Sequence, residues 1–414
     1  MPHVSACVLF VMVAGPLAIA AERVESNPGE CVWTFSSPHG RYQNIVYPQS
    51  GKNGVFLVSN SPDYDGHNYV YHLNPKTGAI VWEADLGDVC CSEPALGTDK
   101  LVVTTTDRLA RASTTFCLNT ASGSIRWRHD HDPHWRTENV GYPYQPVICG
   151  DKVALVAHRF DLPVWTLYDS YRGCNDTPDV SRLICLELDD GYPVLKANDI
   201  HTFDFSRLSS QLDGHIYFGM YKIAPGGKSA SVPICSLALN TGKVQDEHAL
   251  PFPVLPPAPL DAPAIAGGRL YIFDLSRTLT CFELGTHSKP LWSVEPGESA
   301  HGPAAFDDRV VMALQSGHVV CYRGTDGKEL WKRYVDSALE EPIIHNGQVV
   351  VCSRQNVTTL RLDNGTLLWD YFAPKPVLNG RPSAVGDVVL IPTAFNREHI
   401  ALIALKIAEK LPPP

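Results

Sequence analysis

A short cassette, in which a Trp follows a turn Gly by four residues, recurs along the chain and restricts its fold more than any other feature. The full copies are NPKTGAIVW, NTASGSIRW, GTDGKELW and LDNGTLLW, which end at Trp82, Trp127, Trp331 and Trp369. GTHSKPLW, ending at Trp292, is a variant with Ser288 in the Gly position. The Gly permits the positive φ of a tight turn, and a strand follows it. Repetition of this kind predicts a solenoid or a propeller.

Aligned on the cassette, the sequence divides into units with turns near Gly78, Gly123, Gly191, Gly242, Ser288, Gly327 and Gly365. All but one of the intervals are 38 to 51 residues, a length that suits a four-stranded propeller blade. Residues 302–331 illustrate one unit, with expected strands at 304–306, 310–314 and 319–322 and turn residues between them. No helical periodicity competes with these strands.

The two ends of the chain supply one further unit. Residues 381–392 and 399–406 form three expected strands with no Trp cassette after them, and GECVWTF near the N-terminus is an isolated strand carrying Trp33. Ring closure removes sheet edges that would otherwise pair with other chains. We therefore predict an all-β, eight-bladed propeller of four-stranded antiparallel blades over residues 30–406, with the last blade closed by the N-terminal strand. An open array of seven units is the alternative.

Outside the propeller we predict a secretory signal peptide over residues 1–21 and a short tail over residues 407–414. Residues 8–21 are apolar and end in small residues, although no Lys or Arg precedes them. A buried N-terminal strand is the alternative, and the run is too short to span a membrane. The formal net charge of −10 gives no reason to expect a nucleic-acid partner. We expect a periplasmic or secreted monomer.

Cysteines are frequent, with twelve in the chain. Five of them precede a cassette by a similar interval within apolar strands, and we interpret these as small core residues: Cys117, Cys185, Cys235, Cys281 and Cys321. The pattern argues against a dense disulfide framework and leaves the Cys90–Cys91 doublet as an exception.

The third and fourth units depart from the repeat. The third has Leu195 and the fourth has Asp246 where a Trp is expected. The third also carries an insertion at residues 160–182 and follows a long connection at residues 128–145. These departures indicate that the third and fourth units are the part of the ring that carries additions to the basic repeat.

Strands ending in T-G-x-x-x-W resemble the pyrroloquinoline-quinone (PQQ)-type propellers, a group that includes quinoprotein alcohol dehydrogenases and non-catalytic assembly factors of the BamB type. The resemblance extends over residues 30–406. It implies that the cassette packs blade against blade and is not a signature of the cofactor. Trp33, Trp82, Trp127, Trp292, Trp331 and Trp369 are therefore assigned to structure.

The resemblance also gives meaning to Cys90 and Cys91. Quinoprotein dehydrogenases carry a vicinal Cys pair in a similar loop, where it lies against the quinone. A chance doublet is the alternative. Glu93 follows the pair, and it is one of several residues that precede an inner-strand Pro and are expected to circle one mouth of the propeller. Glu341 and Arg381 occupy this position in adjacent units and suit an ion pair; with Glu93 they are the other candidate cofactor residues.

A second candidate site is the sequence HDHDPHW, in which His129, His131 and His134 lie close together. Imidazole and carboxylate groups suit zinc or another transition metal, although a solvated polar loop is the alternative. Trp135 and Trp165 are the Trp residues left without a structural role, and aromatic loops of this kind bind sugars, peptides or proteins. An insertion that packs a small core of its own is the alternative. We group Gln145, at the mouth position of the third unit, with them as candidate ligand-binding residues.

The reading favoured by the sequence is a binding scaffold for a protein or small-molecule ligand. The alternative is a PQQ- and calcium-dependent alcohol or sugar dehydrogenase, and a metal-dependent hydrolase is a third class. No C-x-x-C-H haem site accompanies the Cys pair, and no cofactor is implied beyond PQQ with calcium.

Overall fold

The described parts of the chain consist of strands, turns and bends, without a helix. The computed structural model describes residues 28–39, 44–51, 54–60, 67–87, 90–107, 112–132, 135–136, 138–139, 142–143, 145–159, 181–196, 211–212, 215–219, 222–223, 230–238, 243–251, 263–273, 277–284, 289–336, 340–373, 381–395 and 399–408. Among these residues no helix has the length and apolar character of a membrane span.

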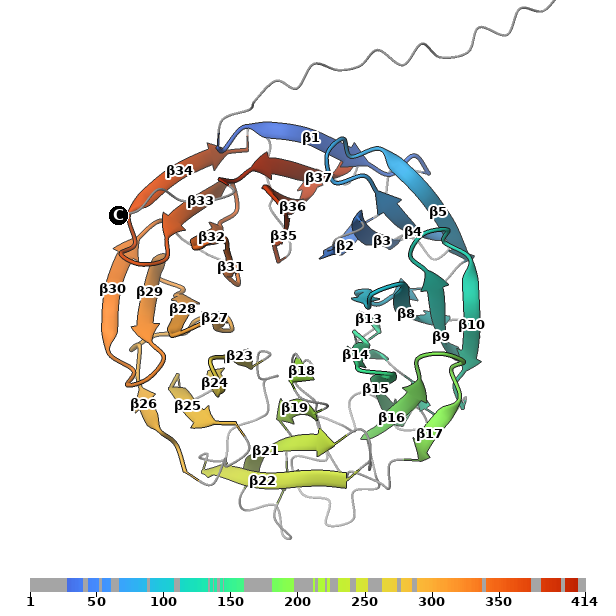
Figure 1. Cartoon of the computed structure of the whole chain (residues 1–414), viewed down its shortest axis with the longest axis horizontal. Helices are drawn as coiled ribbons and strands as arrows, with labels where there is room; N and C mark the ends of the chain where they lie inside the picture. The colour runs from blue at the N-terminus through green and yellow to red at the C-terminus, as the bar shows by residue number, and fades with distance from the viewer. Residues whose placement is uncertain are drawn as a thin grey trace, which may run out of the picture.

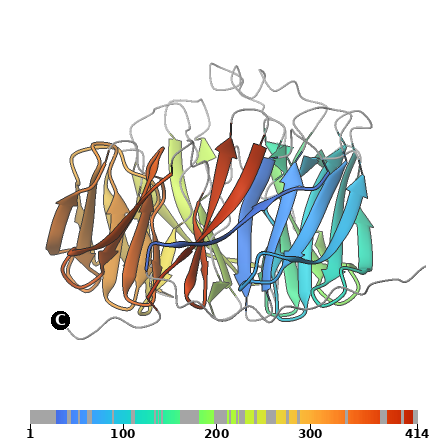
Figure 2. The same ribbon diagram turned by 90° about the horizontal axis from the view of Figure 1, so that it is seen from above.

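The strands form antiparallel sheets arranged around a central axis, as Figure 1 shows. Within most sheets the chain runs outward, from the strand nearest the axis to the outermost strand, and then passes to the next sheet. Figure 2 shows the strands standing steeply across the ring. The ring has two sides. One side carries the Gly turns and the hairpins between the first and second strands of each sheet, and we call it the turn face. The opposite side, where the chain passes between sheets, is the loop face.

The first half of the ring comprises four sheets. The first is β2 (Asn44–Gly51), β3 (Gly54–Asn60), β4 (Asn68–Leu73) and β5 (Ile80–Gly87). The second is β6 (Cys90–Cys91), β7 (Ala95–Leu96), β8 (Lys100–Asp107), β9 (Ala112–Asn119) and β10 (Ile125–Asp130). The third is β11 (Trp135–Arg136), β14 (Val147–Cys149), β15 (Lys152–Arg159), β16 (Ser181–Glu187) and β17 (Pro193–Lys196), with the ribbon β12 (Glu138–Asn139) and β13 (Tyr142–Pro143) before it. The fourth is β18 (Gln211–Leu212), β19 (His215–Gly219), β20 (Lys222–Ile223), β21 (Ala230–Ala238) and β22 (Lys243–Pro251).

The second half is more regular. It contains β23 (Ala264–Ala266), β24 (Arg269–Phe273), β25 (Leu279–Glu283) and β26 (Trp292–Val294), then β27 (Ala304–Phe306), β28 (Arg309–Ala313), β29 (His318–Arg323) and β30 (Glu329–Tyr334). The next sheet is β31 (Ile343–His345), β32 (Gln348–Cys352), β33 (Asn356–Arg361) and β34 (Leu367–Phe372). The strands predicted at 304–306, 310–314 and 319–322 correspond to β27, β28 and β29 to within one residue at each end.

The closing sheet joins the two ends of the chain. Its order is β1 (Cys31–Ser36), β37 (His399–Lys406), β36 (Val388–Phe395) and β35 (Ser383–Val385), so the N-terminal strand is outermost. Gly29 N–H donates to Lys406 O and Lys406 N–H donates to Glu30 O, each at 2.8 Å. The prediction that the N-terminal strand completes the last sheet is therefore confirmed.

Each cassette Trp packs against the turn Gly of the following sheet. The pairs are Trp33 with Gly78, Trp82 with Gly123, Trp127 with Gly191, Trp292 with Gly327, Trp331 with Gly365 and Trp369 with Gly29. A Cβ on any of these glycines would lie 2.5–3.1 Å from the nearest indole atom, and each glycine has a positive φ. Only Gly satisfies both conditions without strain.

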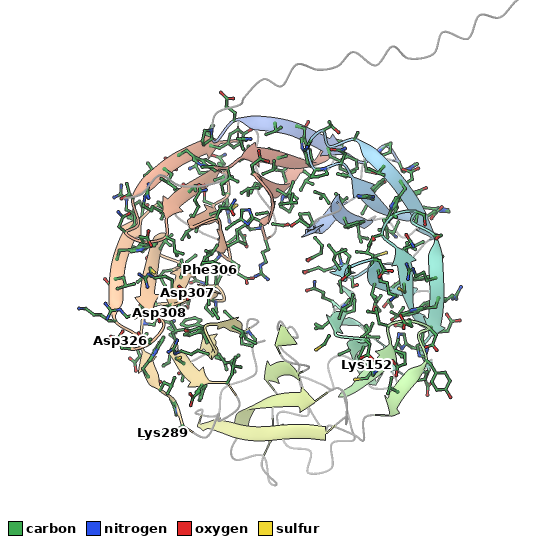
Figure 3. All side chains as sticks on the ribbon, in the orientation of Figure 1. Lys152, Lys289, Phe306, Asp307, Asp308 and Asp326 are labelled. Atoms are coloured by element: carbon green, nitrogen blue, oxygen red, sulfur yellow. The ribbon has the colours of Figure 1, made fainter. Side chains whose placement is uncertain are left out.

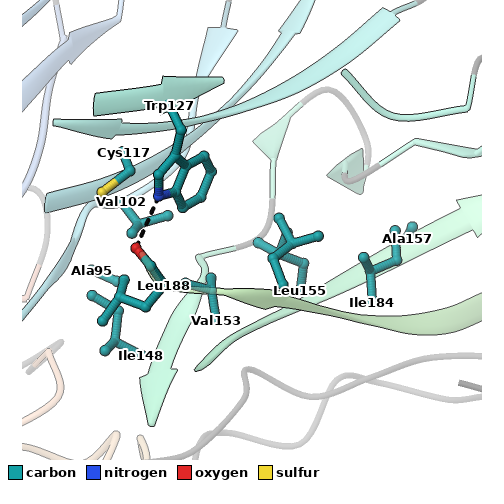
Figure 4. Packing of buried hydrophobic residues seen from close by; sticks show 11 residues of the cluster. Ala95, Val102, Cys117, Trp127, Ile148, Val153, Leu155, Ala157, Ile184 and Leu188 are labelled. Carbon is teal, nitrogen blue, oxygen red and sulfur yellow. Dashed lines mark hydrogen bonds between the residues drawn. The ribbon is translucent and has the colours of Figure 1, made fainter. Parts of the chain in front are cut away.

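A hydrogen bond accompanies the indole contact at five of these junctions. The indole N–H donates to the carbonyl three residues before the contacted Gly, at 2.8–2.9 Å: Trp33 to Pro75, Trp82 to Thr120, Trp127 to Leu188, Trp292 to Gly324 and Trp331 to Leu362. Figure 4 shows the bond from Trp127 above the buried cluster of Val102, Ile148 and Leu155. The cassette is thus a packing device between sheets, as the sequence predicts.

The residue opposite the cassette position on the neighbouring strand is a buried Cys in four sheets. Cys117, Cys281 and Cys321 pair with Trp127, Trp292 and Trp331, and Cys185 pairs with Leu195. All four thiols are fully buried, which confirms the core role predicted for them. Cys235 lies in β21, but its side chain is outside the described part.

Ion pairs join neighbouring sheets on the turn face. Lys100 Nζ lies 2.7 Å from Asp189 Oδ1 in the next sheet, and Arg269 Nη1 lies 3.9 Å from Asp308 Oδ1. Figure 3 shows Phe306 nearest the axis, Asp326 at the rim of the same sheet, and Asp307 and Asp308 between them. Both pairs are partly exposed to solvent, and pairs at the surface contribute little to stability.

Candidate functional site

The β6–β10 sheet extends farther toward the loop face than the regular β27–β30 and β31–β34 sheets. Its strands β8 and β9 have eight residues each, whereas β28 and β32 have five. Strand β6 provides an inner partner for this extension, because Cys90 pairs with Thr106 and Cys91 pairs with Thr105. Glu93 and Pro94 then interrupt the inner edge before β7 begins.

Hydroxyl side chains fill this extension. Thr104, Thr105, Thr106, Ser113, Thr114 and Thr115 are all buried. Thr104 Oγ1 lies 3.2 Å from Thr115 Oγ1, and Thr106 Oγ1 lies 3.3 Å from Ser113 Oγ. Thr105 Oγ1 donates to Thr114 O at 3.2 Å, and Thr114 Oγ1 donates to Asp130 Oδ1 at 2.9 Å. Buried hydroxyls are costly unless they are hydrogen-bonded, and these bonds satisfy all six.

His129 and His131 lie together at the outer side of this layer. Their ring centroids are 4.9 Å apart, as strand alternation predicts for residues two apart. His131 is buried, and its Nε2 lies 2.8 Å from Thr115 Oγ1. Burial lowers the pKa of His129 below its usual value, and the neighbouring Asp130 partly opposes this.

Asp130, between the two imidazoles in sequence, is held by other groups. Its Oδ1 accepts from Arg128 Nε at 2.8 Å and from Thr114 Oγ1 at 2.9 Å. The Arg128 guanidinium lowers the pKa of the Asp130 carboxyl. Within the described segments no three His, Cys, Asp or Glu side chains gather as a metal site. His134 is outside these segments, so a metal site that includes it stays a prediction.

The Cys pair lies in regular strand geometry on the inner edge of the sheet. Cys91 is 1% exposed and belongs to the same buried cluster as Phe56 and Val58 of β3. A sulfur that lies against a quinone has to face the bound ring, and Cys91 faces the neighbouring sheet instead. The side chain of Cys90 is outside the described part. The position of Cys91 does not fit a quinone contact.

Three groups of residues that the sequence analysis singled out separately meet at this extension. Gln145 Nε2 donates to Pro94 O at 3.3 Å, which ties the connection before β14 to the Glu93 loop. Strand β13 lies beside β6 and β8, and β11, which contains Trp135, lies beside β9 and pairs with β15. The Cys pair, the His pair and the 135–145 segment therefore border one junction, between the second and third sheets. We call it the loop-face junction.

The other two mouth residues lie elsewhere in the ring. Arg381 Nη2 is 3.1 Å from Glu341 Oε1, which confirms the ion pair expected between neighbouring sheets. This pair joins the β31–β34 sheet to the closing sheet, away from Glu93. Glu93 belongs to a different sheet and is not part of this ion pair, so a site shared by Glu93, Glu341 and Arg381 stays a prediction.

Some predicted features fall outside the described residues, and others were missed. Trp165 and residues 160–180 of the expected insertion are outside them, whereas Ser181 and Arg182 already belong to β16. Gly29 and Trp33 form a further cassette with the same four-residue spacing, which was not predicted. The hydroxyl layer was not predicted either, although TTTD and ASTT are two unusual polar stretches in the sequence.

Comparisons with known proteins agree with this architecture. The family model described as "Outer membrane protein assembly factor BamB" matches residues 20–165 and 284–409, which is more than half of the chain. A comparison with curated proteins gives no match.

Several solved structures share the fold at low sequence identity. BamB from Moraxella catarrhalis is 13% identical, with a TM-score of 0.60 over 91% of this chain and 99% of that one. Quinohemoprotein alcohol dehydrogenase from Comamonas testosteroni is 11% identical, with a TM-score of 0.57 over 93% and 77%. Saccharomyces cerevisiae Sqt1 is 10% identical, with a TM-score of 0.61 over 92% and 100%. Identities this low establish the fold alone, and it is the family model that decides membership. The chain belongs to the PQQ-like β-propeller repeat family whose model is described by the outer membrane protein assembly factor BamB.

Proposed function

We propose that this protein is a non-catalytic, eight-bladed propeller that binds a protein partner at the loop-face junction. The observation that carries the proposal is the convergence of the Cys90–Glu93 segment, the His129–His131 pair and the 135–145 connection on one junction. Loops gathered on a rigid scaffold are where binding residues concentrate. The family model is named for an assembly factor, which supports a protein as the partner. A small-molecule ligand that binds at the same junction is the second choice.

The location that suits this function is the periplasm or the exterior of the cell. It is supported by the apolar N-terminal run and by the outer-membrane description of the family. On this proposal residues 1–21 are removed as a signal peptide, and the propeller works as a monomer.

A PQQ-dependent dehydrogenase is the competing function, and the residues at the junction do not fit it. Cys91 is buried between two sheets, and Glu341 is paired with Arg381 rather than directed at a shared site with Glu93. Calcium and PQQ require several oxygen ligands and a planar contact surface. We therefore derive no catalytic step from a quinone.

Reconstitution separates the two functions. The purified protein is titrated with PQQ in the presence of calcium and then assayed for dye-linked oxidation of alcohols and sugars. The scaffold proposal expects neither saturable PQQ binding nor turnover, with a known quinoprotein as positive control. Saturable binding that Cys90→Ser abolishes would overturn the proposal.

A further inference from the structure

A chain of buried hydrogen bonds crosses the extension of the β6–β10 sheet from the His pair to the inner edge. His131 Nε2 lies 2.8 Å from Thr115 Oγ1, and Thr115 Oγ1 lies 3.2 Å from Thr104 Oγ1. Thr104 N–H donates to Ser92 Oγ at 3.0 Å, and Ser92 Oγ–H donates to Glu93 O at 2.9 Å. His131, Thr115, Thr104 and Ser92 are all buried, and the most exposed of them, His131, is 7% exposed. We call these four residues the cross-sheet chain.

Backbone bonds fasten both ends of the chain to the sheet. Ser92 N–H donates to Thr104 O at 2.8 Å, and His131 N–H donates to Ser113 O at 2.9 Å. Ser92 follows the Cys pair directly, and His131 begins the connection that leads to Trp135 and Gln145. The cross-sheet chain therefore links the two segments that border the loop-face junction.

The hydroxyls of the chain have two consistent arrangements. When His131 Nε2 carries a proton, it donates to Thr115 Oγ1, and the Thr115 hydroxyl donates to Thr104. When Nε2 is unprotonated, the Thr115 hydroxyl donates to His131 and accepts from Thr104. The direction of both hydroxyls thus follows the state of one imidazole. The link from Thr104 to Ser92 is a backbone N–H donor and is the same in both arrangements, so the two ends are joined by the continuity of the buried bonds.

Two regular sheets lack the central pair of this chain. In the β27–β30 sheet, Ala313 and Val319 take the paired positions that Thr104 and Thr115 take in the β6–β10 sheet. In the β31–β34 sheet, the same positions hold Cys352 and Val357, although this sheet buries hydroxyls elsewhere. A sheet of this ring therefore forms without a hydroxyl pair at this position.

We propose that the cross-sheet chain couples the Cys90–Glu93 segment to the connection that begins at His131, so that a partner engaging one of them also orders the other. The role of this coupling in partner binding rests on the proposed function, whereas the coupling itself can be measured without a partner. Thr104 and Thr115 are in this account positioning residues, which act through Ser92 and His131 and touch no partner themselves.

Hydrogen exchange followed by NMR tests the coupling in the ligand-free protein. The reporters are the amide protons of Ser92 and His131, one at each end of the chain. Thr115→Val removes the central hydroxyl and should raise the exchange rates of both amides by about ten-fold, since both ends lose a buried hydrogen-bonded support. Ser92→Ala should speed exchange at His131, and His131→Ala should speed it at Ser92. Thr115→Ser, which retains the hydroxyl, should restore wild-type rates.

Thr359→Val is the matched control. Thr359 is buried in β33, and its hydroxyl has no hydrogen-bond partner in the described structure, so its removal should leave both reporters unchanged. Coupling is disproved if Thr115→Val speeds exchange only at His131 while Ser92 keeps its wild-type rate. If Thr115→Val does not fold, the reciprocal effects of Ser92→Ala and His131→Ala decide in the same way. The exchange experiment uses the protein without a partner. If it disproves the coupling, the proposal that the protein binds a partner is unaffected. If no partner is found, the measured coupling is unaffected.

Discussion

The indole of each cassette packs on the sheet that follows it, so the effect of replacing a turn Gly depends on whether an indole contacts it. Gly365 receives Trp331, and a Cβ there would lie 2.6 Å from an indole carbon. Gly386 has a similar positive φ of 58°, yet a Cβ there would meet nothing within 4 Å. Both glycines resist replacement by Ala, but only one of them does so because of packing.

Replacing these two glycines by Ala should separate backbone strain from loss of the indole contact. Gly386→Ala should lower the free energy of unfolding by about 1–2 kcal/mol, the cost of a left-handed residue. Gly365→Ala should cost about 1–3 kcal/mol more, because the new methyl displaces the indole. Urea denaturation of both variants measures the difference. Equal losses would show that the Trp331 contact contributes nothing.

Buried thiols make the molecule sensitive to alkaline pH. Burial raises the pKa of Cys117 to about 11 and of Cys185, Cys281 and Cys321 to about 12, from an ordinary value of 9.0. A raised pKa means that the native state keeps protons which the unfolded chain loses. The stabilisation from each thiol is therefore complete below pH 9 and declines as the pH rises toward 12.

Cys321→Ala should flatten this decline in the free energy of unfolding by about 1.4 kcal/mol per pH unit between pH 9 and 11. Val320→Ala is the control, because Val320 is equally buried in the same strand but does not titrate. It should lower stability at every pH and keep the wild-type slope. Equilibrium unfolding at several pH values measures both, and an unchanged slope in Cys321→Ala would contradict the expectation.

At the level of elements, the sequence predicts those strands that repeat locally. Trp331 follows the turn residue Gly327 by four, and two apolar runs precede this turn, so β28, β29 and β30 could be located closely. The Gly29–Trp33 cassette escaped notice because its third strand, β37, is at the other end of the chain. The extension of β8 and β9 escaped because Thr and Ser at 104–106 and 113–115 do not look buried in a sequence. Strand pairing with β6 and the bond to His131 cover them in the fold.

The N-terminal strand should act as a separable closing element. A chain that starts after Ser37 lacks β1 and exposes the edge of β37, so it should self-associate. A synthetic peptide of residues 28–39 should restore a monomer, because Trp33 then reaches Gly78 and Ser37 Oγ regains its 2.7 Å bond to Tyr71. Size-exclusion chromatography with light scattering measures the change. A peptide with Trp33 replaced by Ala is the control, and equal rescue by both peptides would contradict the role assigned to the indole.

For the whole molecule, the sequence predicted a propeller and a decorated region, but it could not place the candidate residues relative to one another. The mouth position groups Glu93 with Glu341 and Arg381, whereas the structure pairs the latter two in another part of the ring. Alternation indicated that His129 and His131 share a side, and the structure confirms it. That His131 and Ser92 belong to one hydrogen-bond chain depends on sheet pairing between segments about forty residues apart, which no local pattern reveals.

The central claim is that the loop-face junction binds a protein partner, and site-specific photo-cross-linking in the source cells tests it most directly. A benzophenone amino acid is placed at Gln145, which borders the junction, and in a second variant at Lys328, which is exposed on the turn face. The account predicts one defined cross-linked protein from position 145 and none from position 328. Adducts of the same protein from both positions, or from position 328 alone, would contradict it.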